Sequence, residues 1–190
     1  MLILAHGAGA DQHHRFMVAF AEGLAARGVE VVTFNFPYTE AKRGAPDKPP
    51  VLQACWRDVI AAVRPSLRGR KLAIGGKSMG GRIASMVAAQ APVADALVFL
   101  GYPLHPPKRP DQLRSKHLPE IAAPMLFVQG TRDPFGGPDE LRPILSGLPA
   151  TIHEVAGGDH SFAVLKKSGR TEAEVFAEAQ EAIVRFLRAQ

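Results

Sequence analysis

Short apolar runs alternate with longer segments of helical periodicity along the whole chain. The runs are apolar at successive positions, which is typical of strands that are buried on both faces of a sheet. They comprise residues 2–5, 29–36, 71–76, 96–101, 123–130 and 150–157.

The first two helices are predicted from apolar residues that recur at helical spacing. Asp11 is the expected cap of the first helix and Gly28 its expected end, while Pro50 and Pro65 bound the second. The apolar faces consist of Phe16, Met17, Phe20 and Leu24 in the first helix, and Leu52, Cys55, Trp56, Val59, Ile60 and Val63 in the second.

Three further helices are predicted, over Met79–Gln90, over Pro138–Leu145 and from Thr171 onward. Thr171 and Glu174 have the spacing of a capping box at the start of the last helix. Its expected apolar face consists of Phe176, Ala179, Ile183, Phe186 and Leu187.

Apolar strands joined by helical crossovers predict an α/β fold with a parallel sheet of about six strands and helices on both faces. No repeat, low-complexity tract or linker interrupts the pattern, so residues 1–190 are expected to form a single domain. Ligands of such sheets bind outside the carboxyl ends of the strands, so functional residues are expected in the loops that follow the strands.

Composition and charge narrow the class of protein. Hydrophobic residues make up 46% of the 190 residues and charged residues 22%, as expected of a folded globular chain. Cys55 is the single cysteine, which leaves no disulfide within the chain and no cysteine-based zinc site. The net charge of +5 comes from dispersed residues with no nucleic-acid motif, so a nucleic-acid partner is not expected.

No signal peptide or membrane-spanning segment is expected from the pattern of apolar residues. The apolar run at the N-terminus stops at His6, and no stretch approaches the roughly 18 apolar residues of a membrane span. We expect a cytoplasmic protein without a membrane partner.

Residues 74–82, "IGGKSMGGR", allow two unrelated hypotheses. A phosphate-binding loop would need a glycine at position 71, where the chain has Lys71 inside a predicted strand. The alternative is a nucleophile elbow, in which Ser78 stands on a tight turn between a strand and a helix, flanked by Gly76 and Gly80. The strand–turn–helix context favours the serine hypothesis.

A nucleophilic serine needs a base and a carboxylate that orients it. His160, in "GGDHSF", follows the last predicted strand, and Asp133, in "QGTRDPFG", follows the fifth. Asp159 is a poor candidate to orient its own neighbour. The order Ser78, Asp133, His160 is that of the α/β-hydrolases.

The developing oxyanion of such a reaction requires two N–H donors. Met79, directly after the nucleophile, is the first candidate. Ala8 is the second, with Gly9 as the alternative, in the loop "HGAGAD". A metal site in the same region, formed by His6, Asp11, His13 and His14, is a competing hypothesis whose spacing matches no familiar ligand set.

Two long loops, residues 35–50 and 102–119, are expected to shape an open, shallow substrate site without a full cap domain. Both carry several lysines and arginines, which would attract an acidic ligand or simply face solvent. The expected wall residues are Tyr38, Tyr102, Leu104 and His105. Cys55 and Trp56 are expected in or near the core.

The sequence resembles the α/β-hydrolase superfamily, and within it the small branch of testis-expressed protein 30 and the hydrolase-like domain of a chromatin NSL-complex subunit. The resemblance implies the α/β-hydrolase fold and the triad Ser78, Asp133 and His160. It also implies one or two strands before the first predicted strand, so the sheet is either a minimal version or lacks an N-terminal segment. The matching stretches are "AHGAGAD", "FNFPY", "GGKSMGGR", "GYPLHPP", "QGTRDPFG" and "GGDHSF".

These observations predict a serine hydrolase that cleaves an ester or thioester of a small acyl substrate through an acyl-enzyme. No metal or organic cofactor is expected. An exposed sheet edge would favour pairing, so the expected state is a monomer or a homodimer. The alternative is a non-catalytic protein-interaction module that retains a hydrolase fold.

Overall fold

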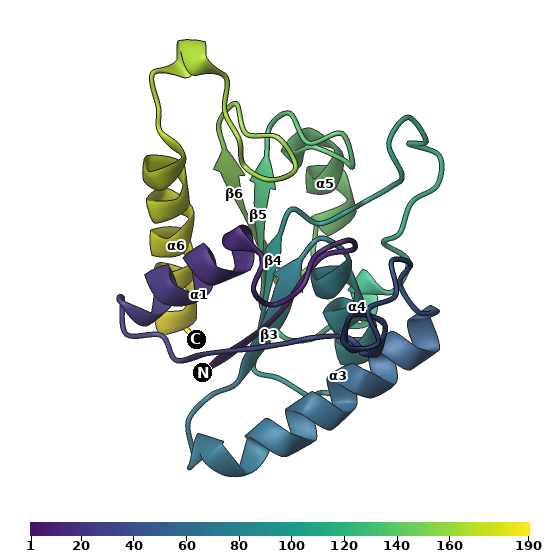
Figure 1. Cartoon of the computed structure of the whole chain (residues 1–190). Helices are drawn as coiled ribbons and strands as arrows, with labels where there is room; N and C mark the ends of the chain where they lie inside the picture. Colours follow the sequence, from purple (N-terminus) through teal and green to yellow (C-terminus); the bar gives the residue numbers. More distant parts are fainter.

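The computed structural model describes residues 1–190 and contains one six-stranded sheet in which all strands are parallel (Figure 1). The strand order is β2-β1-β3-β4-β5-β6. The strands are β1 (Leu2–Ala5), β2 (Val31–Phe34), β3 (Ala73–Lys77), β4 (Ala96–Leu100), β5 (Met125–Gly130) and β6 (Ala150–Val155). The α/β fold class predicted from the sequence is therefore confirmed.

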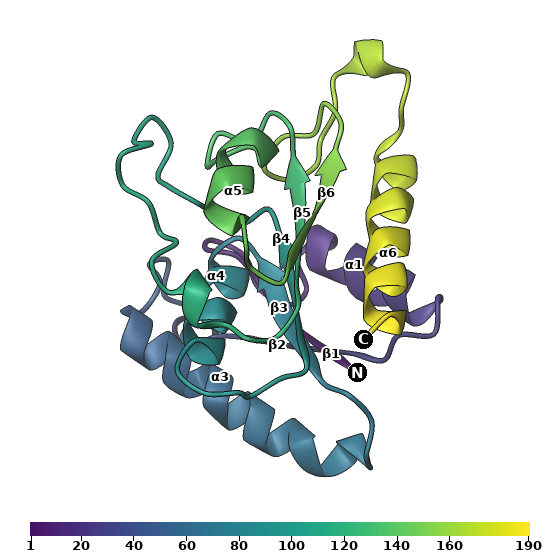
Figure 2. The same ribbon diagram turned by 180° about the vertical axis from the view of Figure 1, so that it is seen from behind.

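Helices cover both faces of the sheet: α1 and α6 lie on one side, and α3, α4 and α5 lie on the other (Figures 1 and 2). None of them combines the length and apolar character that crossing a bilayer requires. The helices are α1 (Arg15–Ala25), α2 (Pro37–Glu40), α3 (Pro49–Val63), α4 (Met79–Ala88), α5 (Pro138–Leu145) and α6 (Glu172–Arg188), with short 3₁₀ turns η1 (Arg64–Leu67), η2 (Leu118–Glu120) and η3 (Lys166–Ser168).

Each strand contributes to two separate cores because successive side chains point to opposite faces. Leu97 and Phe99 of β4 pack in the cluster beneath α3 and α4, together with Trp56. Val98 and Leu100 of the same strand pack in the cluster beneath α1 and α6. The continuous apolar runs in the sequence are explained by this burial on both faces.

Some helix boundaries and faces differ from the sequence predictions. His14, not Asp11, caps α1, because the His14 ring nitrogen accepts the Phe16 N–H at 3.3 Å. The capping box of Thr171 and Glu174 is present at the start of α6. Phe186 and Leu187 are only partly buried, since Val175, Ala182 and Val184 occupy much of the buried face of α6. Trp56 is fully buried and Cys55 partly buried, as predicted.

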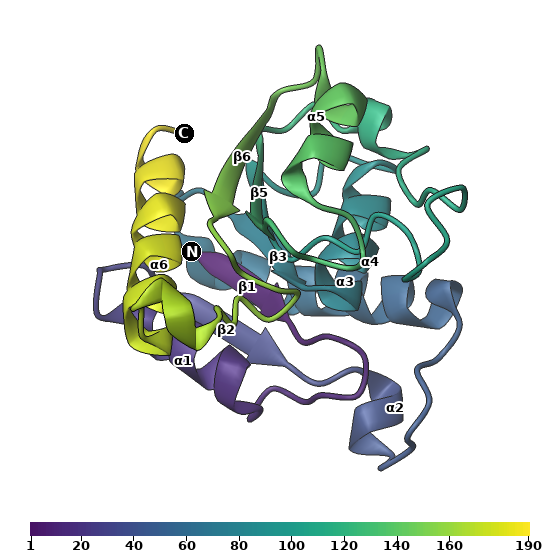
Figure 3. The ribbon, with the colours of Figure 1, turned by 90° about the horizontal axis from the view of Figure 1, so that it is seen from above.

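The parallel arrangement brings the loops that follow β1, β3, β5 and β6 to one edge of the sheet. Figure 3 views this edge from above and shows α2 in the segment that follows β2, at the outside of the molecule. The segment between β4 and β5 contains only the short turn η2 and no cap domain. The two edge strands are β2 and β6.

The contact between α4 and the sheet leaves no space for side chains at several glycines. A Cβ atom at Gly80 would lie 2.5 Å from the Ala5 carbonyl oxygen and 2.6 Å from that of His6. A Cβ atom at Gly76 would lie 2.3 Å from the same Ala5 oxygen. These are backbone atoms of the β1 region, which cannot move away without disturbing β2 and β3.

We expect Gly80→Ala to lower the free energy of unfolding by about 1–3 kcal/mol, the usual range for overpacking. Alanine would otherwise favour the helix by about 1 kcal/mol, so the sign of the change tests the steric argument. Chemical denaturation measures the effect. Gly44→Ala is the control, because no atom lies within 4 Å of the added methyl group. Equal stability of the Gly80→Ala protein and the native protein would contradict the close packing.

Candidate active site

Ser78 occupies the turn between β3 and α4 in a strained backbone conformation. Its φ is 49° and its ψ is −116°, a region that side-chain-bearing residues rarely adopt. The Ser78 N–H donates to the Leu100 carbonyl at 3.0 Å, which ties the turn to β4. The hydroxyl is thereby held at the carboxyl edge of the sheet and at the N-terminus of α4.

The structure brings Ser78, His160 and Asp133 into one chain of hydrogen bonds. His160 Nε2 lies 2.9 Å from Ser78 Oγ, and His160 Nδ1 lies 2.8 Å from Asp133 Oδ2. The Asp133 side chain is inaccessible to solvent, whereas 18% of the His160 side chain is exposed. The imidazole thus connects a buried carboxylate to a hydroxyl that lines a cleft.

Asp133 is held by two donors besides the histidine. The Phe135 N–H donates to Oδ1 at 2.9 Å, and Gln129 Nε2 donates to Oδ2 at 2.9 Å. Gln129 is itself fixed, because its Oε1 accepts the Tyr102 N–H at 2.8 Å. Three donors on an ionised carboxylate match its acceptor-only chemistry and fix its orientation.

Asp159 shapes the loop that carries His160 and does not contact the imidazole through its carboxylate. Its Oδ1 accepts the backbone N–H groups of Ser161 at 2.8 Å and Ala163 at 3.0 Å. The Phe135 ring covers the imidazole at a centroid separation of 4.2 Å. Loop and ring together restrict where the imidazole can lie.

Lys77, the lysine of "IGGKSMGGR", is buried next to Ser78. Its Nζ donates to the His160 carbonyl at 2.6 Å and lies 5.6 Å from the centroid of the Phe16 ring. Burial lowers the pKa of Lys77 to about 8, against the opposing influence of Asp133 and Asp159. The amino group therefore holds the loop that carries His160.

The loop after β1 presents Ala8 beside Met79 in the cleft that contains Ser78. The Ala8 N–H has no hydrogen-bond partner within the chain. Gly9, the alternative donor, lies instead in a neighbouring hollow with Tyr38. At Met79, the first residue of α4, the N–H belongs to the helix end whose donors lack intrahelical partners.

His6 holds the loop after β1 in place through two hydrogen bonds. Its Nε2 accepts the Phe36 N–H at 3.2 Å, so the ring proton resides on Nδ1, which donates to the Gly7 carbonyl at 2.9 Å. Burial lowers the pKa of His6 and keeps the ring neutral. The loops after β1 and β2 are joined through this one imidazole.

The other residues of the competing metal hypothesis also have local partners. Asp11 accepts the His13 N–H at 2.9 Å, and His14 caps α1. No group of three or more His, Cys, Asp and Glu side chains converges as a metal site would require.

A cleft of about 490 Å³ opens in front of Ser78 and His160. The four predicted wall residues, Tyr38, Tyr102, Leu104 and His105, are all at most 5% exposed and do not line it. Tyr102 and Leu104 join the core, and His105 Nε2 lies 3.0 Å from Glu140 Oε2. The wall prediction is therefore corrected: the neighbouring Pro103 and the more distant Arg114 line the cleft.

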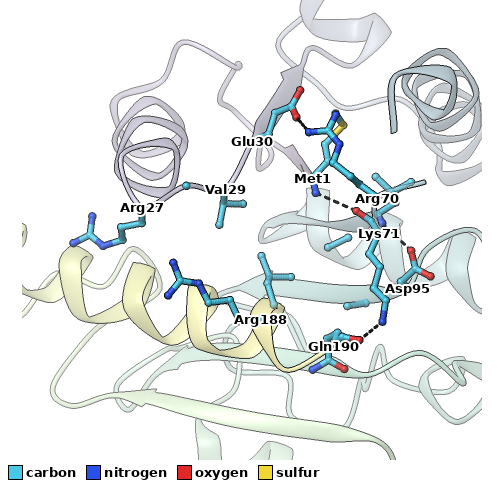
Figure 4. A pocket seen from close by; sticks show the side chains of 14 residues that line it. Met1, Arg27, Val29, Glu30, Arg70, Lys71, Asp95, Arg188 and Gln190 are labelled. Carbon is cyan, nitrogen blue, oxygen red and sulfur yellow. Dashed lines mark hydrogen bonds and ion pairs between the residues drawn. The ribbon is translucent and has the colours of Figure 1, made fainter. Parts of the chain in front are cut away.

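A second hollow of about 250 Å³ lies at the opposite, amino-terminal ends of the strands (Figure 4). Several of its charged groups have partners within the chain: Arg70 pairs with Glu30, and Asp95 accepts the Leu72 N–H at 2.7 Å. It contains no serine beside a histidine of the kind found at the carboxyl edge.

Comparison with known proteins agrees with this geometry. The family model described as "Alpha/beta hydrolase domain" matches residues 1–188. The chain belongs to the alpha/beta hydrolase family.

Solved structures show the same hydrolase fold. A serine hydrolase homologue from Coxiella burnetii superposes with a TM-score of 0.74 at 19% identity, covering 98% of this chain and 85% of that one. A serine hydrolase without a lid from Xanthomonas campestris gives 0.72 at 21% identity, covering 100% and 84%. Est1E from Butyrivibrio proteoclasticus, solved with ferulic acid, gives 0.71 at 14% identity, covering 100% and 89%.

Sequence reasoning missed several residues that build this hydrolase site. Gln129 carried a usable signal, because it is the one polar side chain in the apolar run "MLFVQG" and a buried amide needs partners. Lys77 carries a similar signal, because it is the one charged residue at the end of the buried strand β3. Arg82 and Phe135 carried no such signal, since neither departs from the pattern of its segment.

The lowered pKa of Lys77 predicts a pH-dependent difference in stability between the native hydrolase and Lys77→Met. In the folded protein the amino group loses its proton near pH 8, whereas in the unfolded chain it does so near pH 10.4. Burial therefore penalises the charged folded state below pH 8, and that penalty fades as the pH rises.

The free energy of unfolding of the native protein should thus increase relative to Lys77→Met between pH 8 and about 10.4. Urea denaturation of both proteins across this range measures the difference, and groups common to both cancel. A constant difference would show that Lys77 titrates normally.

Proposed function

We propose that the protein is a serine hydrolase that cleaves carboxylic esters or thioesters through an acyl-enzyme. The observation that carries the proposal is the hydrogen-bonded chain Ser78–His160–Asp133, with Ser78 on a strained elbow. Family membership and neighbours described as serine hydrolases support it. Est1E, a neighbour solved with ferulic acid, and an esterase domain from Rhodothermus marinus support the choice of ester bonds. The narrower resemblance to the branch of testis-expressed protein 30 also remains a proposal.

In the acylation step, Ser78 Oγ attacks the substrate carbonyl carbon while His160 Nε2 accepts the hydroxyl proton. Asp133 holds the Nδ1–H and stabilises the imidazolium. The N–H groups of Met79 and Ala8 stabilise the negative charge on the tetrahedral oxygen. Collapse of this intermediate breaks the ester or thioester bond, and His160 gives its proton to the leaving alcohol or thiol.

In the deacylation step, His160 accepts a proton from water, and the resulting hydroxide attacks the acyl-enzyme. The second tetrahedral intermediate releases the carboxylic acid, and the proton returns to Ser78 Oγ. The protein groups and one water molecule account for every atom and proton of the reaction. The open cleft, without a cap domain, gives that water access to the acyl group.

Fluorophosphonate labelling tests the nucleophile, because this reagent modifies a serine only when a neighbouring base activates it. We expect labelling at Ser78, located by peptide mapping, and no labelling of Ser78→Ala or His160→Ala. Ser85, which is also buried beside a histidine at 2.7 Å, is the matched control, and Ser85→Ala should still be labelled. Failure to label folded native protein would favour a non-catalytic interaction module.

Asp133→Asn is expected to lower kcat on the order of 10⁴-fold, because an amide in this position favours the wrong tautomer of His160. The fold should be retained, which circular dichroism and the Tm report. Asp159→Asn is the matched control: its carbonyl can still accept the Ser161 and Ala163 N–H groups, so the loss should be far smaller. A near-normal rate for Asp133→Asn, measured with an activated ester, would refute the assignment of this carboxylate.

A further inference from the structure

Two arginines face the cleft beside the proposed nucleophile. Arg82 lies on α4 four residues after Ser78, about one helical turn away, and Arg114 belongs to the loop that follows β4. Both line the cleft together with Ser78 and His160. The same cleft also contains apolar side chains, among them Leu52, Met79 and Phe135, so a polar and an apolar part of one ligand could both be accommodated.

Neither guanidinium has an anionic partner in the chain. The one hydrogen bond of the Arg82 side chain is a long contact of 3.7 Å to the Met86 sulfur, and its Nε is shielded from solvent without a partner. The Arg114 side chain forms no hydrogen bond or ion pair. Buried or partly buried guanidinium groups are normally paired, so these two have unused binding capacity.

The one carboxylate that lines the cleft is already neutralised. Asp47 accepts two hydrogen bonds from Arg43, at 2.7 and 3.0 Å. Lys77 is also committed, because its amino group donates to the His160 carbonyl. Among the Lys and Arg side chains that line the cleft, those of Arg82 and Arg114 are therefore the two without an oxygen partner.

The two arginines are held close together at some cost. Burial lowers the pKa of Arg82, and the nearby positive charge of Arg114 lowers it further. The Arg114 backbone is anchored: its N–H donates to the Leu104 carbonyl at 2.7 Å, and its carbonyl accepts the Tyr102 hydroxyl at 2.8 Å. A preformed pair of like charges is the arrangement that an anion stabilises.

We propose that Arg82 and Arg114 bind an anionic group of the substrate, so that the preferred substrates are esters or thioesters bearing a carboxylate or phosphate. The proposal rests on the proposed serine hydrolase activity and adds the substrate class. Because Arg82 and Ser78 are one helical turn apart and line the same cleft, the anionic group and the scissile carbonyl would share that cleft. Bidentate hydrogen bonds from guanidinium to carboxylate or phosphate oxygens would orient that carbonyl toward Ser78.

The kinetic test compares two activated esters of equal acyl length, mono-p-nitrophenyl adipate and p-nitrophenyl hexanoate. For a leaving group that carries the charge, 4-acetoxybenzoate is compared with 4-methylphenyl acetate. The native protein should prefer the anionic member of at least one pair in kcat/KM by about 10- to 100-fold, the range for a hydrogen bond to a charged group. The preference should decline as salt is added.

Arg82→Gln and Arg114→Gln should each reduce this preference about 10-fold. Arg82→Lys should retain part of it. The matched control is Arg109→Gln, an exposed arginine in the same loop as Arg114 that does not line the cleft, and it should keep the native ratio. Equal kcat/KM for both members of both pairs, or a preference unaffected by Arg82→Gln and Arg114→Gln, would overturn the proposal.

Binding without turnover separates this proposal from the proposed function. In a Ser78→Ala background, adipate or inorganic phosphate should raise the Tm, relative to chloride at equal ionic strength, and added Arg82→Gln should abolish the shift. A Tm shift without fluorophosphonate labelling of native protein would support the anion site and refute the hydrolase. Labelling without any shift or any anionic preference would support the hydrolase and refute the anion site.

Discussion

The close approach of α4 to β1 and β3 is the constraint on which the rest of the structure depends. The chain turns from β3 into α4 within one residue, and that residue, Ser78, adopts a positive φ of 49°. The turn is possible because Gly76 and Gly80 have no Cβ atoms to meet the Ala5 carbonyl. Strain at a single residue costs on the order of 1–3 kcal/mol, and it persists because the two cores fix the helix and the strands on either side.

Polar side chains at the carboxyl edge convert this geometry into a site. Gln129 connects β5 to the loop after β4 and to Asp133, while Lys77 connects the end of β3 to the loop that carries His160. Gln129 and Lys77 each find a partner on another strand or loop, so the two side chains fix loop positions relative to the sheet. His6 does the same for the loops after β1 and β2. The orientation of the imidazole thus depends on residues that never contact a substrate.

The fold and the three central residues could be predicted from the sequence because both follow from local pattern and strand order. Apolar runs identify the strands, and Ser78, Asp133 and His160 each follow one of them, within five residues of its end. The cleft wall could not be predicted. Tyr102 and Leu104 are apolar or aromatic residues in a long loop, and such residues fill either a binding site or the space beneath the loop. Here they close the core between α4 and β5, so the loop exposes Pro103 and Arg114 to the cleft.

Arg82 shows that a charged residue in a sequence does not by itself indicate a binding site, because the partners of its side chain are known only from the structure. Among several cations near the carboxyl edge, Arg43 is neutralised by Asp47 and Lys77 donates to a backbone carbonyl. Arg82 and Arg114 differ from both, because neither guanidinium has an oxygen partner although each residue lies on an element that other contacts fix. Two unpaired guanidinium groups next to a nucleophile would not help to bind a neutral ester. Their partial removal from water costs free energy, and only an anion bound between them would compensate for that cost. For an anionic ester, the same desolvation strengthens the attraction between the guanidinium groups and the substrate anion. Because this attraction acts close to the position of the scissile carbonyl, it would both bind the substrate and discriminate against neutral esters.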